Sequence, residues 1–147
     1  MDSNLQTALI LIVIGILVFG GGGQPPRTAI DATPSEVTLL ARLIEAEAGG
    51  EPYRGKVAVG AVVVNRLRDS RFPNTIRDVI YEPGQFAVSA MNRPPSEESI
   101  RAARAALSGE DPTNGALFFY NPRTARLDPW WQTRTRLTQI GNHVFLR

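Results

Sequence analysis

The sequence predicts an α+β domain that is mostly helical, and three patterns indicate this class. Capped amphipathic helices are predicted over residues 34–48 and 96–107. An apolar run at 116–120, which follows a cluster of turn residues, predicts a strand. A chain of 147 residues supports one domain of ordinary size. We therefore expect one working domain over residues 34–147, with β structure toward its C-terminal end.

The first 23 residues differ from the rest of the chain. Residues 8–19 form an apolar run that only Gly15 interrupts, and no charge lies between Asp2 and Arg27. At about 1.5 Å per residue the run covers roughly 18 Å, less than the ~30 Å hydrocarbon core of a bilayer. The positive charge that begins an export signal is missing. We predict a hydrophobic anchor or export segment over 1–23, then a Gly/Pro linker over 24–33.

The composition excludes several functional classes. Sixteen Lys and Arg residues against 14 Asp and Glu give a net charge of +2, which does not indicate a nucleic-acid partner. The chain has no cysteine, so disulfides, thiol nucleophiles and Cys-ligated metals are excluded. With His143 as the single histidine, a zinc site is not expected. We predict no metal and no cofactor.

The helix over 34–48 has clear start and stop signals. Thr33 can cap it, Pro34 suits the first helical position and Glu36 completes a capping box. The Gly-Gly pair at 49–50 should end it. At 100° per residue one face of this helix is apolar. That face consists of Val37, Leu40, Leu43 and Ile44.

Glu47 falls inside this apolar stripe, whereas Glu45 is expected to point toward solvent. A charged carboxylate at a core position costs several kcal/mol unless it is paired or hydrogen-bonded. A low dielectric favours the protonated form of a carboxyl, which is the form that a general acid needs. Glu47 is therefore a candidate catalytic acid. An ion pair with a buried arginine such as Arg66, or a place at a groove edge, is the alternative.

Short blocks with a distinctive composition occur in order across residues 36–147. They are ARLIEAEAGGEPY (41–53), GKVAV (55–59), NR (65–66), FPNT (72–75), EPGQF (82–86), YNP (120–122) and GNHVF (141–145). This ordered set resembles the SleB/CwlJ family of cell-wall hydrolases. The resemblance implies cleavage of peptidoglycan glycan strands, a compact lysozyme-like fold with a small β element, and Glu47 as the catalytic glutamate.

The resemblance also changes the predicted secondary structure of residues 57–64. Their β-branched composition alone predicts a buried strand. The family implies a helix packed under the catalytic one, with Ala58, Gly60 and Ala61 permitting close helix contact. We therefore expect a helix there.

Further residues are candidates for contact with the substrate. Glu51 precedes a proline in a turn and could serve as a cap or a supporting acid. Gln85 can donate and accept hydrogen bonds, and Phe86 can support a sugar face or pack in the core. The remaining candidates follow the predicted strand and are Tyr120, Asn121 and Trp131. His143 is expected to be a structural hydrogen-bonding residue.

A single well-placed carboxylate favours a lytic transglycosylase over a hydrolase with two acids. Hydrolysis with Glu51 as the second acid is the first alternative, and a non-catalytic wall-binding or virion structural protein is the second. We expect the partner to be the peptidoglycan glycan strand and the location to be the cell envelope. A phage virion is the alternative location. Residues 8–23 are expected either to contact a membrane or to be buried in a larger assembly.

Overall fold

The computed structural model describes residues 28–126 and 128–147. The hydrophobic segment predicted over 1–23 and the first residues of the linker lie outside these ranges. Within them, every helix is too short or too polar to cross a bilayer.

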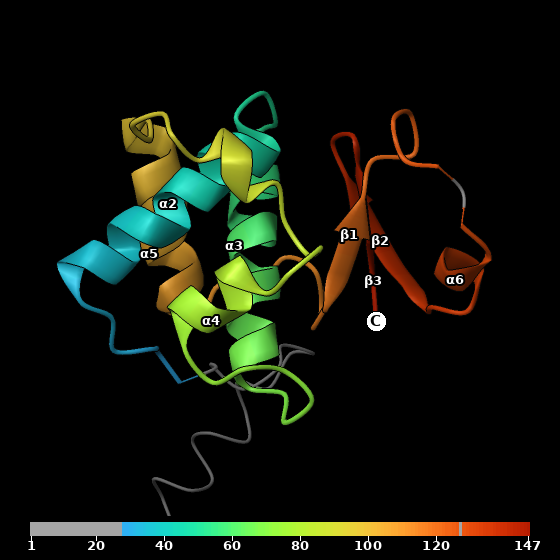
Figure 1. Ribbon diagram of the computed structural model, residues 1–147, viewed down its shortest axis with the longest axis horizontal. Coiled ribbons are helices and arrows are strands. Elements are labelled where there is room, and N and C mark those ends of the chain that lie inside the picture. Colours follow the sequence, from blue (N-terminus) through green and yellow to red (C-terminus); the bar gives the residue numbers. More distant parts are fainter. Residues whose placement is uncertain (1–27, 127) are drawn as a thin grey trace, which may run out of the picture.

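The described residues form a helical lobe and a smaller sheet lobe that lie side by side (Figure 1). The helical lobe contains α2 (Pro34–Ala48), α3 (Tyr53–Leu67), α4 (Ile76–Tyr81), the short 3₁₀ helix η1 (Val88–Ala90) and α5 (Glu97–Leu107). The sheet lobe contains β1 (Phe118–Tyr120), α6 (Pro129–Gln132), β2 (Arg136–Ile140) and β3 (His143–Leu146). The prediction of a mostly helical α+β domain with a small sheet is confirmed.

α2 begins where the sequence predicts. The Thr33 side chain accepts a hydrogen bond from the Glu36 amide, and Glu36 Oε2 accepts one from the Thr33 amide at 2.8 Å. Two amides that the helix cannot satisfy internally are thus bonded. The helix ends at Ala48, and Gly49 is its C-cap residue. The capping box fixes the register of α2 and with it the direction in which Glu47 points.

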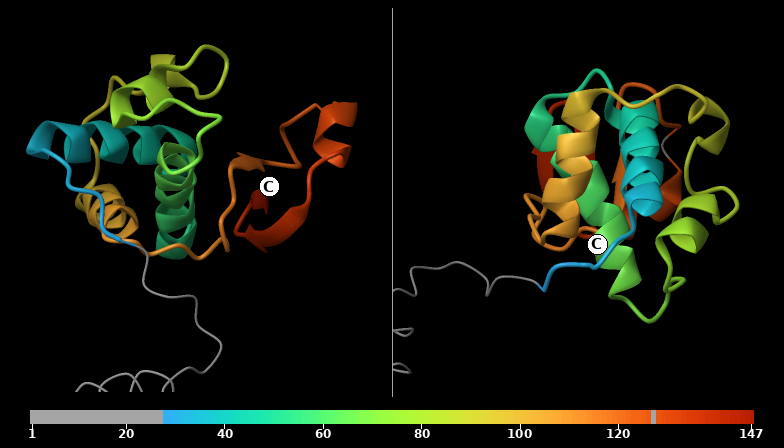
Figure 2. Two further views of the ribbon diagram at one scale, coloured as in Figure 1. Left: turned by 90° about the horizontal axis from the view of Figure 1, so that it is seen from below. Right: turned by 90° about the vertical axis from the view of Figure 1, so that its left-hand side faces the viewer.

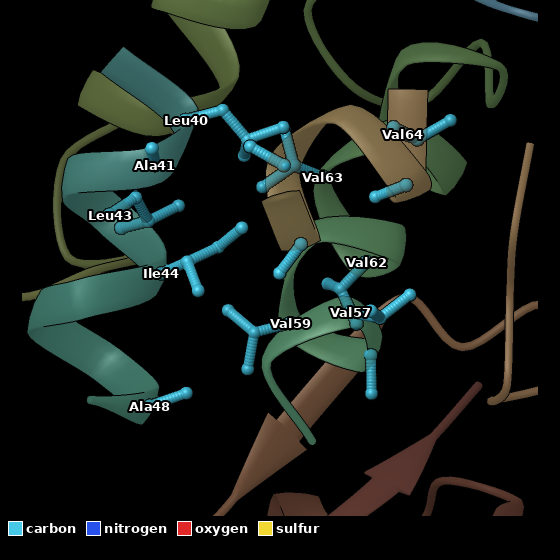
Figure 3. Close-up of a cluster of buried hydrophobic side chains, with 14 of the residues drawn as sticks. Leu40, Ala41, Leu43, Ile44, Ala48, Val57, Val59, Val62, Val63 and Val64 are labelled. Atoms are coloured by element: carbon cyan, nitrogen blue, oxygen red, sulfur yellow. The ribbon is translucent and has the colours of Figure 1, made fainter. Parts of the chain in front are cut away.

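α3 is a helix despite its valines, because it is buried nearly all round. Ten consecutive α3 residues from Val57 to Arg66 are buried, and the apolar face of α2 packs onto them. Leu40, Leu43 and Ile44 are 0% exposed. The side chains of Leu40 and Ile44 extend toward α3, where Val63 and Val59 lie (Figure 3). Packing from several sides outweighs the modest intrinsic preference of valine for strands.

α3 packs closely against α2 and α5 at Gly60, one of the small residues expected to permit close helix contact. A Cβ at this position would lie 2.8 Å from Ala106 Cβ and 3.1 Å from Ile44 Cδ1. Gly60→Val is therefore expected to lower the free energy of unfolding by about 2–3 kcal/mol through overpacking. Urea denaturation measures this effect, with Gly50→Ala as the control because no atom lies within 4 Å of that Cβ. Unchanged stability in Gly60→Val would mean that the three helices pack less closely.

The sheet is antiparallel, with strand order β1-β3-β2. The central strand, β3, is buried along its whole length. It follows β2 through a two-residue turn in which Gly141 has φ +56, a conformation that glycine adopts without strain. α3 lies between the other helices and the sheet, as the left view of Figure 2 shows. The cleft described below lies between these two lobes.

Part of the predicted linker contacts the domain. The Ile30 amide donates to the Leu107 carbonyl at 2.8 Å, and the Ile30 and Ala32 side chains pack against the core. The final residues before α2 therefore add to the folded unit.

The predicted strand at 116–120 is shorter than expected, because only 118–120 pair with β3.

Candidate active site

Glu47 lies in the last turn of α2 and is partly buried. Its Oε1 accepts a hydrogen bond from the Ala87 amide at 2.8 Å. Ala87 follows the turn at 82–86 and precedes η1, so a segment 40 residues away in the sequence orients this carboxylate. The alternative of an ion pair with Arg66 is wrong. In the part of the chain that the structure describes, no such pair lies within 4.0 Å, and Arg66 donates to Leu117 and Gln85 instead.

Two adjoining cavities form a cleft, and Glu47, Asn121 and His143 border both of them. The first cavity, the polar half, has a volume of about 590 Å³. The second, the aromatic half, has a volume of about 480 Å³. Side chains that border only the polar half include Arg42, Glu45, Glu51 and Arg93, and those that border only the aromatic half include Gln85, Phe86, Tyr120, Trp130 and Trp131. Glu47 thus stands at the junction of a polar and an aromatic surface.

Glu51 is held inside the wall of the polar half. Its side chain is only 8% exposed, and Oε2 accepts a hydrogen bond from the Asn142 amide at 3.2 Å. Its Oε1 lies 3.9 Å from His143 Nδ1. A Cβ on Gly141 would collide with the Glu51 carboxylate, so the glycine lets the β2–β3 turn approach it closely. Glu51 therefore joins the end of α2 to the sheet lobe.

His143 begins β3 and is 6% exposed. Its ring lies among aromatic side chains, with its centroid 5.0 Å from that of Phe119 and 6.3 Å from that of Phe145. Burial lowers the pKa of His143 below its ordinary value, and the nearby carboxylates of Glu51 and Glu47 only partly offset this effect. The imidazole is therefore neutral at neutral pH.

The buried Arg66 side chain holds Gln85 and Phe86 of the aromatic half in place. It is 3% exposed, Nε donates to the Leu117 carbonyl at 2.8 Å, and Nη1 donates to Gln85 Oε1 at 3.1 Å. Its guanidinium lies 4.9 Å from the Phe86 ring centroid, within cation–π range. Burial lowers the pKa of Arg66 to about 10, so it stays charged. Gln85 is fixed by this contact, while Phe86 both packs against the core and borders the cleft.

The far wall of the aromatic half is a cluster of rings. The Tyr120 and Trp131 centroids lie 4.9 Å apart, and those of Trp130 and Trp131 lie 4.8 Å apart. Trp130 is the more exposed tryptophan, at 39%. Exposed aromatic faces above a groove suit the apolar faces of sugar rings. Asn121 at the end of β1 places a polar group beside them.

The expectation that Glu45 points to solvent is wrong. Glu45 Oε2 accepts hydrogen bonds from the Ser96 amide at 3.2 Å, the Ser96 hydroxyl at 2.8 Å and the Ser99 hydroxyl at 2.5 Å. These donors lie at the N-terminus of α5, where a carboxylate is stabilised by unpaired amides and by the helix dipole. The helical wheel of α2 gave the direction of Glu45 but carried no information about the neighbouring helix.

Glu45→Gln is expected to lower the free energy of unfolding by about 1 kcal/mol at pH 7, because charge-assisted hydrogen bonds at a partly exposed site become neutral ones. The hydrogen bond from Ser99 is the main cause that lowers the pKa of Glu45 below its ordinary 4.5. Its contribution is therefore complete above pH 4.5 and is lost as the pH falls through the lower folded-state value. Melting temperatures of both proteins should converge as the pH falls below the folded-state pKa of Glu45. A difference that persists there would contradict the assignment.

A third hollow, of about 380 Å³, borders Thr28, Arg68 and Arg147. Its single acidic side chain, Asp69, accepts hydrogen bonds from Arg71, which keep the pKa of Asp69 well below its usual range. A stably charged carboxylate does not suit proton donation.

Among the residues described, no cluster of three or more His, Asp or Glu side chains could hold a metal ion.

The structure brings the candidate site residues together around the cleft. Several other residues that border the cleft were not candidates from the sequence, among them His143, Asn142 and Trp130. The GNHVF block carried the signal for the first two, because a glycine before two polar residues at a strand start indicates a tight approach to another segment. Trp130 was passed over because the sequence does not show which tryptophan faces solvent.

Comparison with known proteins identifies the class. The family model for Cell Wall Hydrolase matches residues 50–146, well over half of the chain. The chain therefore belongs to the SleB/CwlJ cell wall hydrolase family. The match begins just after Glu47, so it bears on the cleft walls more than on this residue.

The individual relatives agree with this placement. The chain is 40% identical to a spore cortex-lytic enzyme of Bacillus cereus, over 87% of this chain and 53% of that protein. It is 33% identical to the cell wall hydrolase CwlJ of Bacillus subtilis, over 79% of this chain and 87% of that protein. The chain thus spans about half the length of the spore cortex-lytic enzymes that it matches.

Two solved structures share the fold. The catalytic domain of the Bacillus cereus SleB protein superposes with a TM-score of 0.75 at 38% identity, covering 86% of this chain and all of that one. The catalytic domain of the germination-specific lytic transglycosylase SleB from Bacillus anthracis gives 0.73 at 38% identity, covering 79% of this chain and 97% of that one.

Proposed function

We propose that this chain cleaves the glycan strands of bacterial peptidoglycan between N-acetylmuramic acid and N-acetylglucosamine, as a lytic transglycosylase. The observation that carries the proposal is the position of Glu47, whose carboxylate borders both halves of the cleft. A strand along the cleft would pass this carboxylate with sugars on either side. The names of the relatives, a spore cortex-lytic enzyme and a lytic transglycosylase, support the same substrate and reaction.

In the proposed reaction Glu47 acts first as an acid and then as a base. Its carboxyl protonates the glycosidic oxygen, the bond from C1 of N-acetylmuramic acid to that oxygen breaks, and N-acetylglucosamine leaves. The substrate's own acetamido oxygen can stabilise the positive charge that develops at C1. The Glu47 carboxylate then takes the proton from the 6-hydroxyl, whose oxygen bonds to C1 and closes a 1,6-anhydro ring. No water is consumed.

The surroundings of Glu51 favour this route over hydrolysis with a second acid. Glycosidases with two acids need both carboxylates beside the sugar, one of them to attack C1 or to activate water. The Glu51 carboxylate instead bonds the Asn142 amide and faces His143, and its side chain is almost fully enclosed. We infer that Glu51 supports the cleft wall from behind. We also propose that the fold is lysozyme-like, as the family resemblance implies.

Cleavage in water enriched in ¹⁸O distinguishes the two routes. A transglycosylase yields 1,6-anhydro products that contain no ¹⁸O, because the 6-oxygen comes from the substrate. A hydrolase places one ¹⁸O atom at the new reducing end. Incorporation of ¹⁸O in most of the products would replace the present proposal with hydrolysis.

We further propose that the chain acts at the cell envelope, with residues 1–23 as its anchor or export segment. Relatives from Bacillus and Oceanobacillus are named as cortex-lytic or cell wall enzymes, and these names support an envelope location. They give no support to the virion alternative. Removal of residues 1–27 is expected to leave a folded and fully active domain, because Ile30 and the residues after it make the contacts with the core. Thermal melting and a cleavage assay check this, and insoluble or inactive protein would contradict it.

A further inference from the structure

His143 is a buried polar side chain whose hydrogen bonds are incomplete. It is more than nine-tenths buried, and no hydrogen bond reaches its enclosed Nδ1 from any residue that the structure describes. Glu51 Oε1 lies 3.9 Å from Nδ1, beyond hydrogen-bond range. Buried polar atoms are nearly always satisfied in native proteins, so an unpaired one calls for an explanation such as a functional role. His143 also borders both halves of the cleft.

The groups around His143 determine which ring nitrogen carries the proton. Its charged neighbours are Glu51, in the turn between α2 and α3, and Glu47, on α2. From the strands, the rings of Phe119 and Phe145 lie beside it. In a neutral imidazole one nitrogen donates and the other accepts. Placing the proton on Nδ1, toward the Glu51 carboxylate, leaves Nε2 as an acceptor.

We propose that His143 is a substrate-binding residue of this cleft, in which Nε2 accepts a hydrogen bond from an N–H or O–H group of the sugar beside Glu47, while Glu51 fixes the tautomer. This inference rests on the proposed function, since it takes a glycan strand as the ligand. It gives Glu51 a positioning role: the enclosed carboxylate acts through the imidazole and does not touch the sugar.

The rival explanation is that His143 only fills space between aromatic rings. Three substitutions of His143 distinguish a substrate contact from a packing role. Gln places an amide near the position of Nε2, Asn places one near the position of Nδ1, and Phe keeps only the ring. A packing role predicts that Phe is the mildest change, whereas a substrate contact through Nε2 predicts that Gln is.

The test is made in the full chain carrying Glu47→Gln, so that a soluble tetrasaccharide of alternating N-acetylglucosamine and N-acetylmuramic acid can bind without being cut. We expect His143→Gln to keep its Kd within about threefold, and His143→Asn and His143→Phe to weaken binding about tenfold or more, as loss of one hydrogen bond of about 1.4 kcal/mol implies. Tyr81→Phe, an exposed change on α4, is the control. Melting temperatures of all variants are recorded alongside.

Equal binding by all three His143 variants would overturn the inference. So would a ranking in which Phe binds best, or losses that follow the melting temperatures and not the order Gln, Asn, Phe. A parent chain that binds no glycan, together with a wild-type chain that cuts none, would overturn the proposed function and this inference together. Cleavage by the wild type with unaffected His143 variants would overturn this inference alone.

Discussion

Glu47→Gln is expected to lower the rate of peptidoglycan cleavage by a factor of about 1,000 or more. An amide cannot donate the proton that the leaving oxygen requires. Its carbonyl can still accept the hydrogen bond from Ala87, so the geometry of the cleft is kept. The melting temperature should stay the same or rise slightly, because the substitution removes a partly buried ionisable group. Release of soluble fragments from purified peptidoglycan measures the rate.

Glu97→Gln, an exposed change in the first turn of α5, is the matched control and should retain wild-type activity. Full activity in Glu47→Gln would remove this residue from the reaction. A loss of activity accompanied by a large fall in melting temperature would point instead to a structural role for Glu47.

The second large effect is expected from a graded pair of substitutions at Glu51. Glu51→Gln keeps an oxygen that can accept from the Asn142 amide and from His143, so cleavage should fall by about tenfold or less. Glu51→Ala leaves the Asn142 amide unpaired and removes the carboxylate that faces His143, so it should lower cleavage about 100-fold, because the imidazole and the β2–β3 turn lose their support. Both variants should still give anhydro products.

Product analysis and initial rates check this pair. If Glu51 were the second acid of a hydrolase, glutamine would be as damaging as alanine, because neither side chain can attack C1 or activate water. Equal and severe losses in both variants would therefore favour hydrolysis. Glu110→Gln, a carboxylate that follows α5 and does not border the cleft, controls for charge.

Much of the helical lobe could be predicted because its signals are local. The capping box of Thr33 and Glu36 fixes the start of α2, and the apolar stripe places Glu47 on the face that bears Leu40 and Ile44. α3 is the informative exception. Its valines predict a strand, and only the family resemblance gave a helix, because burial from several sides is a property of the whole fold.

The parts of the site that were not predicted depend on contacts between distant residues. Glu45 meets Ser96 and Ser99 of α5, more than 50 residues away, and the helical wheel of α2 contains nothing about that helix. Glu51 and His143 are brought together across 92 positions by the β2–β3 turn. The sequence showed both residues, but it did not show that they share one wall of the cleft.

The most direct test of the central claim is a digest of purified peptidoglycan by the full chain and by Glu47→Gln, analysed side by side by mass spectrometry. The account predicts 1,6-anhydro-muropeptides, each lighter by one water than the hydrolysed product, from the wild type alone. Reducing-end muropeptides from the wild type would contradict the transglycosylase mechanism, and the same products from both proteins would contradict the role of Glu47.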